Sequence, residues 1–127
     1  MTIHNLDAYI GALWDWGFLN DCFVGTTIRV SDLDGIVERN GWFLVIEAKG
    51  SGKPIPRGQM IAFSALANKG FTILMVWGQP NSPEAMQVWY PNREEPQPQR
   101  AATIDDIKNI VSRWFNWANA NGSVVAA

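Results

Sequence analysis

The sequence predicts an α/β protein in which helices flank a mixed central β-sheet. An Asn40-Gly41 pair separates two β-rich runs, and such a pair is the strongest short-range signal for a β-hairpin. Residues 57–69 read as a helix, and residues 71–77 form a continuous apolar run that is typical of a central strand. A hairpin followed by a strand that a helix delivers gives a sheet with antiparallel and parallel pairs.

The N-terminal half supplies the remaining elements before that helix. Residues 5–16 carry apolar side chains at helical spacing, and a glycine follows them as a stop signal. Residues 22–30 mix Phe, Val, Thr and Ile, which suggests a strand or a bent pair of strands. We expect the hairpin strands at 31–39 and 42–49, with the second strand buried on both faces.

The C-terminal half continues the pattern. The helix at 57–69 ends at Gly70, which suits the position after a helix C-terminus. A short strand is expected at 86–90, and the proline-rich segment 91–100 is expected to be a loop. Thr103 then opens an apparent capping box and a last amphipathic helix.

Composition bounds the class of protein. With 127 residues, 47% of them hydrophobic and seven Trp, the chain is expected to form one folded domain, 1–127. No apolar run reaches the roughly 18 residues of a membrane span, and the N-terminus lacks a basic signal-peptide start. The single cysteine, Cys22, suits a reducing cytoplasm. One His and one Cys argue against a zinc site.

Charge is distributed unevenly along the chain. The net charge of −2 does not indicate a nucleic-acid-binding protein. Between Ala48 and Pro83, however, there are basic residues and no acidic one. These basic residues are Lys49, Lys53, Arg57 and Lys69. The stretch is either a binding surface or an ordinary solvated face.

Acidic residues gather at the open end of the expected hairpin. If the turn has two residues, Asp34 pairs directly with Glu47, and Asp32 pairs with Lys49. Strand alternation places these four side chains on one face. Opposed carboxylates have Cβ atoms about 4.5–5.5 Å apart and destabilise a sheet. They need a compensating cation, and a hard divalent metal held by oxygen ligands is the natural one.

Asp34, the Glu-x-Lys at 47–49 and a downstream helix carrying Gln59 resemble the PD-(D/E)XK nuclease superfamily. The pattern is closest to the small stand-alone VRR-NUC-type and Holliday-junction-resolvase-like nucleases. The resemblance covers about residues 5–78. It implies a restriction-endonuclease-like core of order α-β-β-β-α-β, with the C-terminal strand and helix as an extension.

The resemblance leaves two assignments open. Asp34 is our choice for the family's aspartate because it faces Glu47, and Asp32 is the reserve. The family also has an acidic residue on its first helix, for which this chain offers Asp7 or Asp15.

The residue types suit phosphodiester hydrolysis. Asp34 and Glu47, with the main-chain carbonyl of Ala48 that the resemblance implies, would bind Mg²⁺ or Mn²⁺. Lys49 would orient or deprotonate a water and neutralise charge on the phosphate. Gln59 shares a helix face with apolar neighbours, so it is expected to point inward, and the resemblance implies that it supports the lysine or the water.

The sequence therefore favours a metal-dependent DNA endonuclease that selects flaps, junctions or ends, as in DNA repair, recombination or phage DNA processing. We expect Lys53, Arg57 and Lys69 to contact phosphates. Cutting both strands would require a homodimer, with Trp117 as one contact. The alternatives are a non-catalytic nucleic-acid-binding module on the same fold and a structural or interaction protein. Taken by itself, a Glu-x-Lys on a strand is usually an ordinary surface ion pair.

Overall fold

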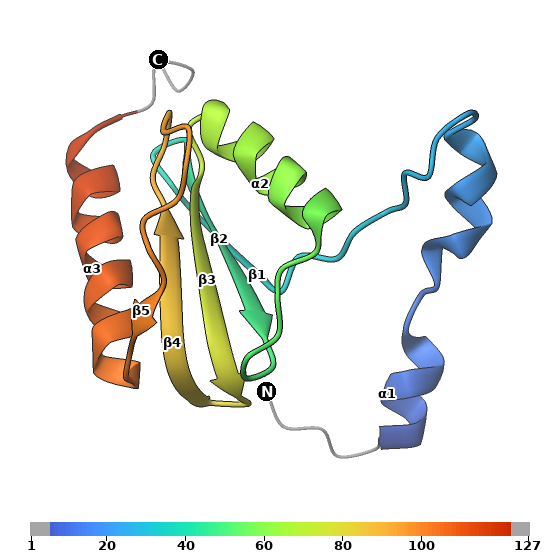
Figure 1. The fold of residues 1–127 in the computed structure, drawn as a ribbon, viewed down its shortest axis with the longest axis horizontal. Helices are drawn as coiled ribbons and strands as arrows, with labels where there is room; N and C mark the ends of the chain where they lie inside the picture. The colour runs from blue at the N-terminus through green and yellow to red at the C-terminus, as the bar shows by residue number, and fades with distance from the viewer. Residues whose placement is uncertain (1–5, 123–127) are drawn as a thin grey trace. The chain divides into compact units, whose positions relative to one another are not determined.

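A five-stranded mixed sheet organises the chain in the computed structural model, which describes residues 6–122 (Figure 1). The strands lie in the order of the sequence: β1 (Gly35–Arg39), β2 (Trp42–Lys49), β3 (Thr72–Gln79), β4 (Ser82–Trp89) and β5 (Arg100–Ala101). β2 and β3 are parallel, and every other neighbouring pair is antiparallel. The predicted α/β class and mixed sheet are confirmed.

The β1–β2 hairpin has the register that its turn predicts. Arg39 pairs with Trp42, and the turn residues Asn40 and Gly41 have φ angles of 53° and 83°. Positive φ at both positions is what a two-residue turn of this kind requires. The first strand is shorter than expected, however, because the ladder begins at Gly35 and not at residue 31. The predicted pairing of Asp32 with Lys49 is therefore wrong.

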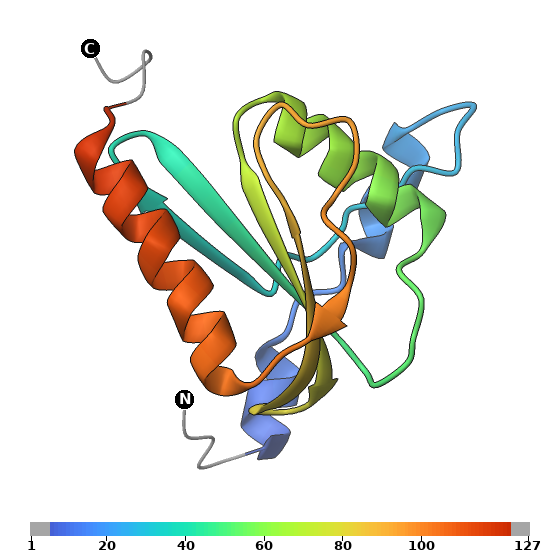
Figure 2. The same ribbon diagram turned by 60° about the vertical axis from the view of Figure 1, so that its left-hand side comes forward.

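Two helices cover opposite faces of the sheet, α2 (Arg57–Asn68) on one and α3 (Ile104–Ala120) on the other (Figures 1 and 2). Adjacent residues of β2 illustrate the division. Val45 packs in the cluster that contains Phe63 of α2, whereas Leu44 packs with Trp114 of α3. Both strand residues are fully buried, so β2 is covered on both faces, as predicted. Alternation then assigns Glu47 to the α2 face.

The C-terminal half follows the prediction with three differences. α3 is capped by Thr103 and Asp106 in a reciprocal capping box, as expected. β4 starts at Ser82, earlier than the predicted residue 86, because Ser82, Pro83 and Ala85 still pair with β3. β5 was not predicted, since a two-residue strand carries no sequence signal. Trp117, the expected dimer contact, packs against Trp42 with ring centroids 4.6 Å apart.

The N-terminal segment differs more from the prediction. The helix expected at 5–16 is α1 (Leu6–Ala12), and residue 5 lies outside the described residues. A 3-10 helix, η1 (Trp16–Cys22), follows separately. Asp15 accounts for the break, since its side chain accepts a hydrogen bond from the Gly17 N–H at 2.9 Å. The carboxylate thus caps a new helix, and the first helix does not continue.

The strand expected at 22–30 is not formed, which corrects the prediction. Gly25 has a φ of 79°, and the Thr26 hydroxyl donates to the Phe23 carbonyl at 2.7 Å and accepts from the Ile28 N–H at 3.1 Å. These local bonds replace a strand ladder. The order from residue 33 onward is β-β-α-β-β-β-α, so the first strand of the expected α-β-β-β-α-β core is missing.

Contacts divide the chain into two compact units, with the boundary between Asp32 and Leu33. The sheet, α2 and α3 belong to the second unit, as do Asp34, Glu47, Lys49 and Gln59. Within residues 6–122, no helix is long and apolar enough to cross a membrane.

Candidate active site

Glu47 is the buried acid of the sheet. It lies near the carboxyl end of β2, is paired with Met75 of β3, and is 3% exposed. Gln59, in the first turn of α2, contacts Glu47 from the helix that covers this face of the sheet: its Nε2 donates to Glu47 Oε2 at 3.2 Å. The inward direction of Gln59 is the one that its helix face predicts. A strand and the helix that follows it thus bring an acid and an amide together.

Two buried oxygens in this pair have no hydrogen-bond partner among the described residues. They are Glu47 Oε1 and Gln59 Oε1. A buried acceptor without a donor costs about 1–3 kcal/mol, so folded proteins rarely leave one unexplained. Because the two oxygens belong to side chains that are hydrogen-bonded to each other, a single proton donor or cation beside them could interact with both.

Asp34 lies at the open end of the hairpin, one residue before β1. Continuation of the Gly35–Ile46 pairing brings it opposite Glu47. The Ala48 N–H donates to Asp34 Oδ2 at 2.8 Å, which fixes the carboxylate against the end of β2. Asp34 and Glu47 therefore lie close enough for their charges to interact, but the expected pairing of the two in the strand ladder is not formed, because Asp34 lies in a bend and the ladder begins at Gly35.

The pKa of Glu47 is raised above its ordinary value of 4.5. The largest cause is burial, which penalises the charged form, and the second is the negative charge of Asp34. The Asp34 backbone and the Lys49 charge lower this pKa, but burial, the Asp34 charge and the Asp34 side chain together outweigh them. A proton or a cation that neutralises the buried Glu47 carboxylate would therefore stabilise it.

Lys49 lies two residues beyond Glu47 on the same face of β2, about 7 Å further along the strand. It is half-buried and pairs with Trp77 of β3 in the parallel ladder. Its ammonium makes no ion pair or hydrogen bond with residues 6–122, so the simple Glu–Lys surface ion pair is not formed. Its charge remains available to an anion at this end of the sheet.

The donor set can be tested against a metal. Within the described chain, no group of three or more His, Cys, Asp or Glu side chains is arranged to hold one. The two carboxylates, the orphaned amide oxygen of Gln59 and the backbone carbonyl of the exposed Ala48 are all oxygen donors. Hard cations such as Mg²⁺ accept one or two carboxylates and keep several waters. The residues present fit that kind of cation and do not form a closed cage.

The three basic residues proposed to contact phosphate are exposed but not clustered. Lys53, in the loop before α2, and Arg57, its first residue, lie at the same end of the helix as Gln59. Lys69 caps the other end, about 18 Å away along the helix axis. Asp32, the reserve for Asp34, belongs to the N-terminal unit, as do Asp7 and Asp15, the two candidates for the acidic residue of the first helix.

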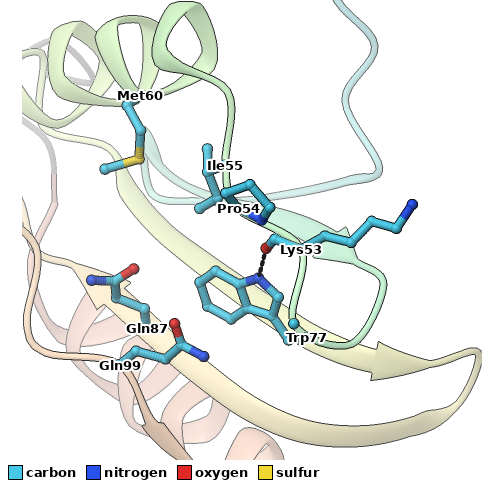
Figure 3. A pocket seen from close by; sticks show the side chains of 8 residues that line it. Lys53, Pro54, Ile55, Met60, Trp77, Gln87 and Gln99 are labelled. Atoms are coloured by element: carbon cyan, nitrogen blue, oxygen red, sulfur yellow. Dashed lines mark hydrogen bonds between the residues drawn. The ribbon is translucent and has the colours of Figure 1, made fainter.

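A cavity of about 320 Å³ adjoins this end of the sheet (Figure 3). Its wall includes Met60, next to Gln59, and Trp77, which pairs with Lys49. The Trp77 Nε1 donates to the Lys53 carbonyl at 2.7 Å and so fixes the loop over the strand. Gln87 and Gln99 line the other side. The sequence does not predict these two amides, because isolated glutamines carry no pattern.

No family model matches the chain, and no curated protein or solved structure shows significant similarity to it.

Proposed function

We propose that the chain is a metal-dependent DNA endonuclease of the PD-(D/E)XK type, built on a restriction-endonuclease-like core that lacks its first strand. The β1-β2-α2-β3 order supports this, with an aspartate before β1, Glu-x-Lys at the end of β2 and an inward glutamine on α2. One observation carries the proposal. The bonded Glu47–Gln59 pair retains two buried unpartnered oxygens beside a second carboxylate, Asp34.

In this proposal Asp34, Glu47 and the Ala48 carbonyl would hold Mg²⁺ or Mn²⁺. The ion would polarise the phosphate and lower the pKa of a water at the site. Gln59 keeps the Glu47 carboxylate in place through its 3.2 Å hydrogen bond. Removal of either carboxylate would leave too few charged oxygens for a hard cation.

In this proposal Lys49 interacts with both reacting groups, the phosphate and the attacking water. Its ammonium neutralises charge that develops on the phosphate oxygens, and it orients the attacking water. The water oxygen bonds to phosphorus, and the bond from phosphorus to one sugar oxygen breaks. The water gives up a proton to solvent, and the released sugar oxygen takes one up. The products are a phosphate monoester at one end and a hydroxyl at the other.

Charge and size favour recognition of DNA shape over sequence. Lys53 and Arg57 flank the site, Lys69 is more distant, and the net charge is −2. With so few phosphate contacts, log K should fall with log salt with a slope of about 3–4, since each neutralised phosphate contributes about 0.9. Flaps, junctions and ends are the substrates that suit such a surface. Cleavage of both strands would involve a second copy of the chain.

The test is cleavage of supercoiled plasmid, single-stranded, flap and four-way-junction DNA, each with Mg²⁺, Mn²⁺ or EDTA. We expect cleavage of at least one branched or ended substrate with metal and none with EDTA. Glu47→Gln should abolish it, whereas Glu94→Gln, an acid-to-amide change at an exposed position away from the site, should not. Metal-independent cleavage, or full activity in Glu47→Gln, would contradict the assignment.

A non-catalytic nucleic-acid-binding module on the same fold is the second candidate. The observation in its favour is that only two carboxylates meet in the described part of the site. Such a module would retard branched DNA in a gel equally with Mg²⁺ and with EDTA, and would leave every DNA intact.

A further inference from the structure

A second cavity, of about 510 Å³, lies on the α3 face of the sheet. Its volume is in the range of about 300–1,000 Å³ that is usual for small-molecule sites. Aromatic rings dominate its wall: Trp42, Tyr90, Trp114 and Trp117. Tyr90 and Trp117 are 38% and 43% exposed, so their rings are accessible to a ligand, whereas Trp114 is buried.

The charged groups of this cavity have one sign. Arg93 and Arg113 line it, and no Asp or Glu does. Neither guanidinium forms an ion pair or a side-chain hydrogen bond with residues 6–122. Glu94 and Glu95 follow Arg93 in the sequence but lie outside the lining. The cavity therefore complements an anion, and arginine suits phosphate because its planar fork can donate two parallel hydrogen bonds.

The loop that carries Tyr90 and Arg93 is held in place. The Asn92 N–H donates to the Ala67 carbonyl at 2.9 Å, and the Trp89 Nε1 donates to the Arg93 carbonyl at 2.9 Å. The cavity also reaches Thr72, which is 3% exposed and presents a hydroxyl. A wall fixed before binding reduces the entropy cost of recognition.

We propose that this cavity binds a nucleotide, with the base against the rings of Tyr90 and Trp117 and the phosphate on Arg93 and Arg113. An aromatic heterocycle joined to a phosphate matches both halves of the lining, and base–aromatic stacking tolerates any base. The ligand is either a free nucleotide or the phosphorylated end of a nucleic-acid strand, since both present the same groups.

This site is separate from the candidate active site. Trp42 and Thr72 lie at the amino ends of β2 and β3, whereas Glu47 lies near the carboxyl end of β2, about 17 Å along the strand. The two sites also use opposite faces, because Trp42 packs with the α3 cluster. Nucleotide binding here does not rest on the proposed nuclease activity.

The test is isothermal titration in EDTA with three probes: AMP, adenosine and ribose 5-phosphate. We expect AMP to bind at least tenfold more tightly than either fragment. Equal binding of AMP and adenosine would overturn the role of the arginines. Equal binding of AMP and ribose 5-phosphate would overturn the role of the rings, and no binding of AMP or of a phosphorylated strand end would overturn the site.

Variants assign the contacts. Arg93→Gln and Arg113→Gln should each weaken AMP binding about tenfold and leave adenosine unchanged, and Trp117→Ala should weaken both. Arg100→Gln removes a charge outside the cavity and should change nothing. Unchanged AMP affinity in the first two variants, with an unaltered circular dichroism spectrum, would overturn the proposal.

Two further experiments distinguish a free nucleotide from a strand end, and this cavity from the candidate active site. Hexathymidylate with a 5′-phosphate is compared with the same strand without it: a gain from the phosphate supports a strand end, and binding of AMP alone supports a free nucleotide. Glu47→Gln should retain AMP binding even if it loses all nuclease activity. Loss of AMP binding in Glu47→Gln would overturn the separation of the two sites.

Discussion

Replacement of Glu47 by Gln should stabilise the metal-free protein at neutral pH. In the wild type, Glu47 Oε1 and Gln59 Oε1 are buried acceptors with no donor among the described residues. The new amide of Glu47→Gln can donate to Gln59 Oε1 while its oxygen keeps the bond from Gln59 Nε2, and it carries no buried charge. Because each orphaned acceptor costs about 1–3 kcal/mol, we expect a gain of about 2 kcal/mol.

The gain should depend on pH in one direction. Burial and then the Asp34 charge raise the folded-state pKa of Glu47 above the ordinary 4.5. The folded protein therefore holds a proton that the unfolded chain releases, and wild-type stability falls as pH rises from 4.5 through the folded-state pKa. Below pH 4.5 both states are protonated, and a protonated Glu47 can donate to Gln59 much as the amide does. The advantage of Glu47→Gln should be small at pH 4 and should grow as pH rises through the folded-state pKa of Glu47.

Urea unfolding followed by tryptophan fluorescence, at pH 4 and pH 8 in EDTA, measures this difference. At pH 8 a gain of about 2 kcal/mol corresponds to a rise in Tm of about 8 °C for a protein of this size. The exposed control Glu94→Gln should move stability by less than about 0.5 kcal/mol at either pH. A Glu47→Gln variant that is no more stable than the wild type at pH 8, or whose gain is the same at pH 4, would refute the reasoning.

Three further predictions concern catalysis and the fold. Lys49→Ala should abolish cleavage but retain Mn²⁺ binding, because an ammonium is no ligand for a hard cation; wild-type cleavage in a nicking assay would remove its catalytic role. Gly78→Ala should destabilise the protein by about 2–4 kcal/mol, because φ is 153° at this position and an added Cβ would lie 2.4 Å from the Ser82 carbonyl oxygen. Gly58→Ala is the control: this glycine has open space around it on α2, so the change should stabilise the protein by up to about 1 kcal/mol. Urea denaturation compares the two variants. Thr103→Ala removes the α3 capping box and should lower the free energy of unfolding by about 1 kcal/mol in the same assay, with an unchanged value counting against the cap.

The sequence predicted those features that depend on local chemistry. Asn40 and Gly41 specify a two-residue turn, and that turn sets the hairpin register from Arg39–Trp42 to Gly35–Ile46. The inward direction of Gln59 follows from the apolar residues on its helix face, and its Nε2 lies 3.2 Å from Glu47 Oε2. The candidate site could therefore be assembled from the sequence, apart from the two orphaned oxygens, which depend on burial.

The features that failed depend on partners. Residues 22–30 have the composition of a strand, but no strand of the sheet pairs with them. The Thr26 hydroxyl instead forms hydrogen bonds with the backbone of its own segment. The first helix ends early because the Asp15 side chain caps a new helix. The spacing of the apolar residues is the same with or without this interruption, so the spacing could not predict it. The nucleotide-sized cavity could not be predicted, since Trp42 and Arg113 meet only when α3 packs on the sheet.

Binding of Mn²⁺ is the central claim, and electron paramagnetic resonance tests it directly. Free Mn²⁺ gives a six-line signal that weakens when the ion binds to protein. We expect the wild type and Lys49→Ala to reduce the signal with one ion per chain, and Asp34→Ala and Glu47→Gln to leave it at the level of free Mn²⁺. Equal loss of signal in all four proteins, or no loss in the wild type, would contradict the assignment of a divalent-cation site to Asp34 and Glu47.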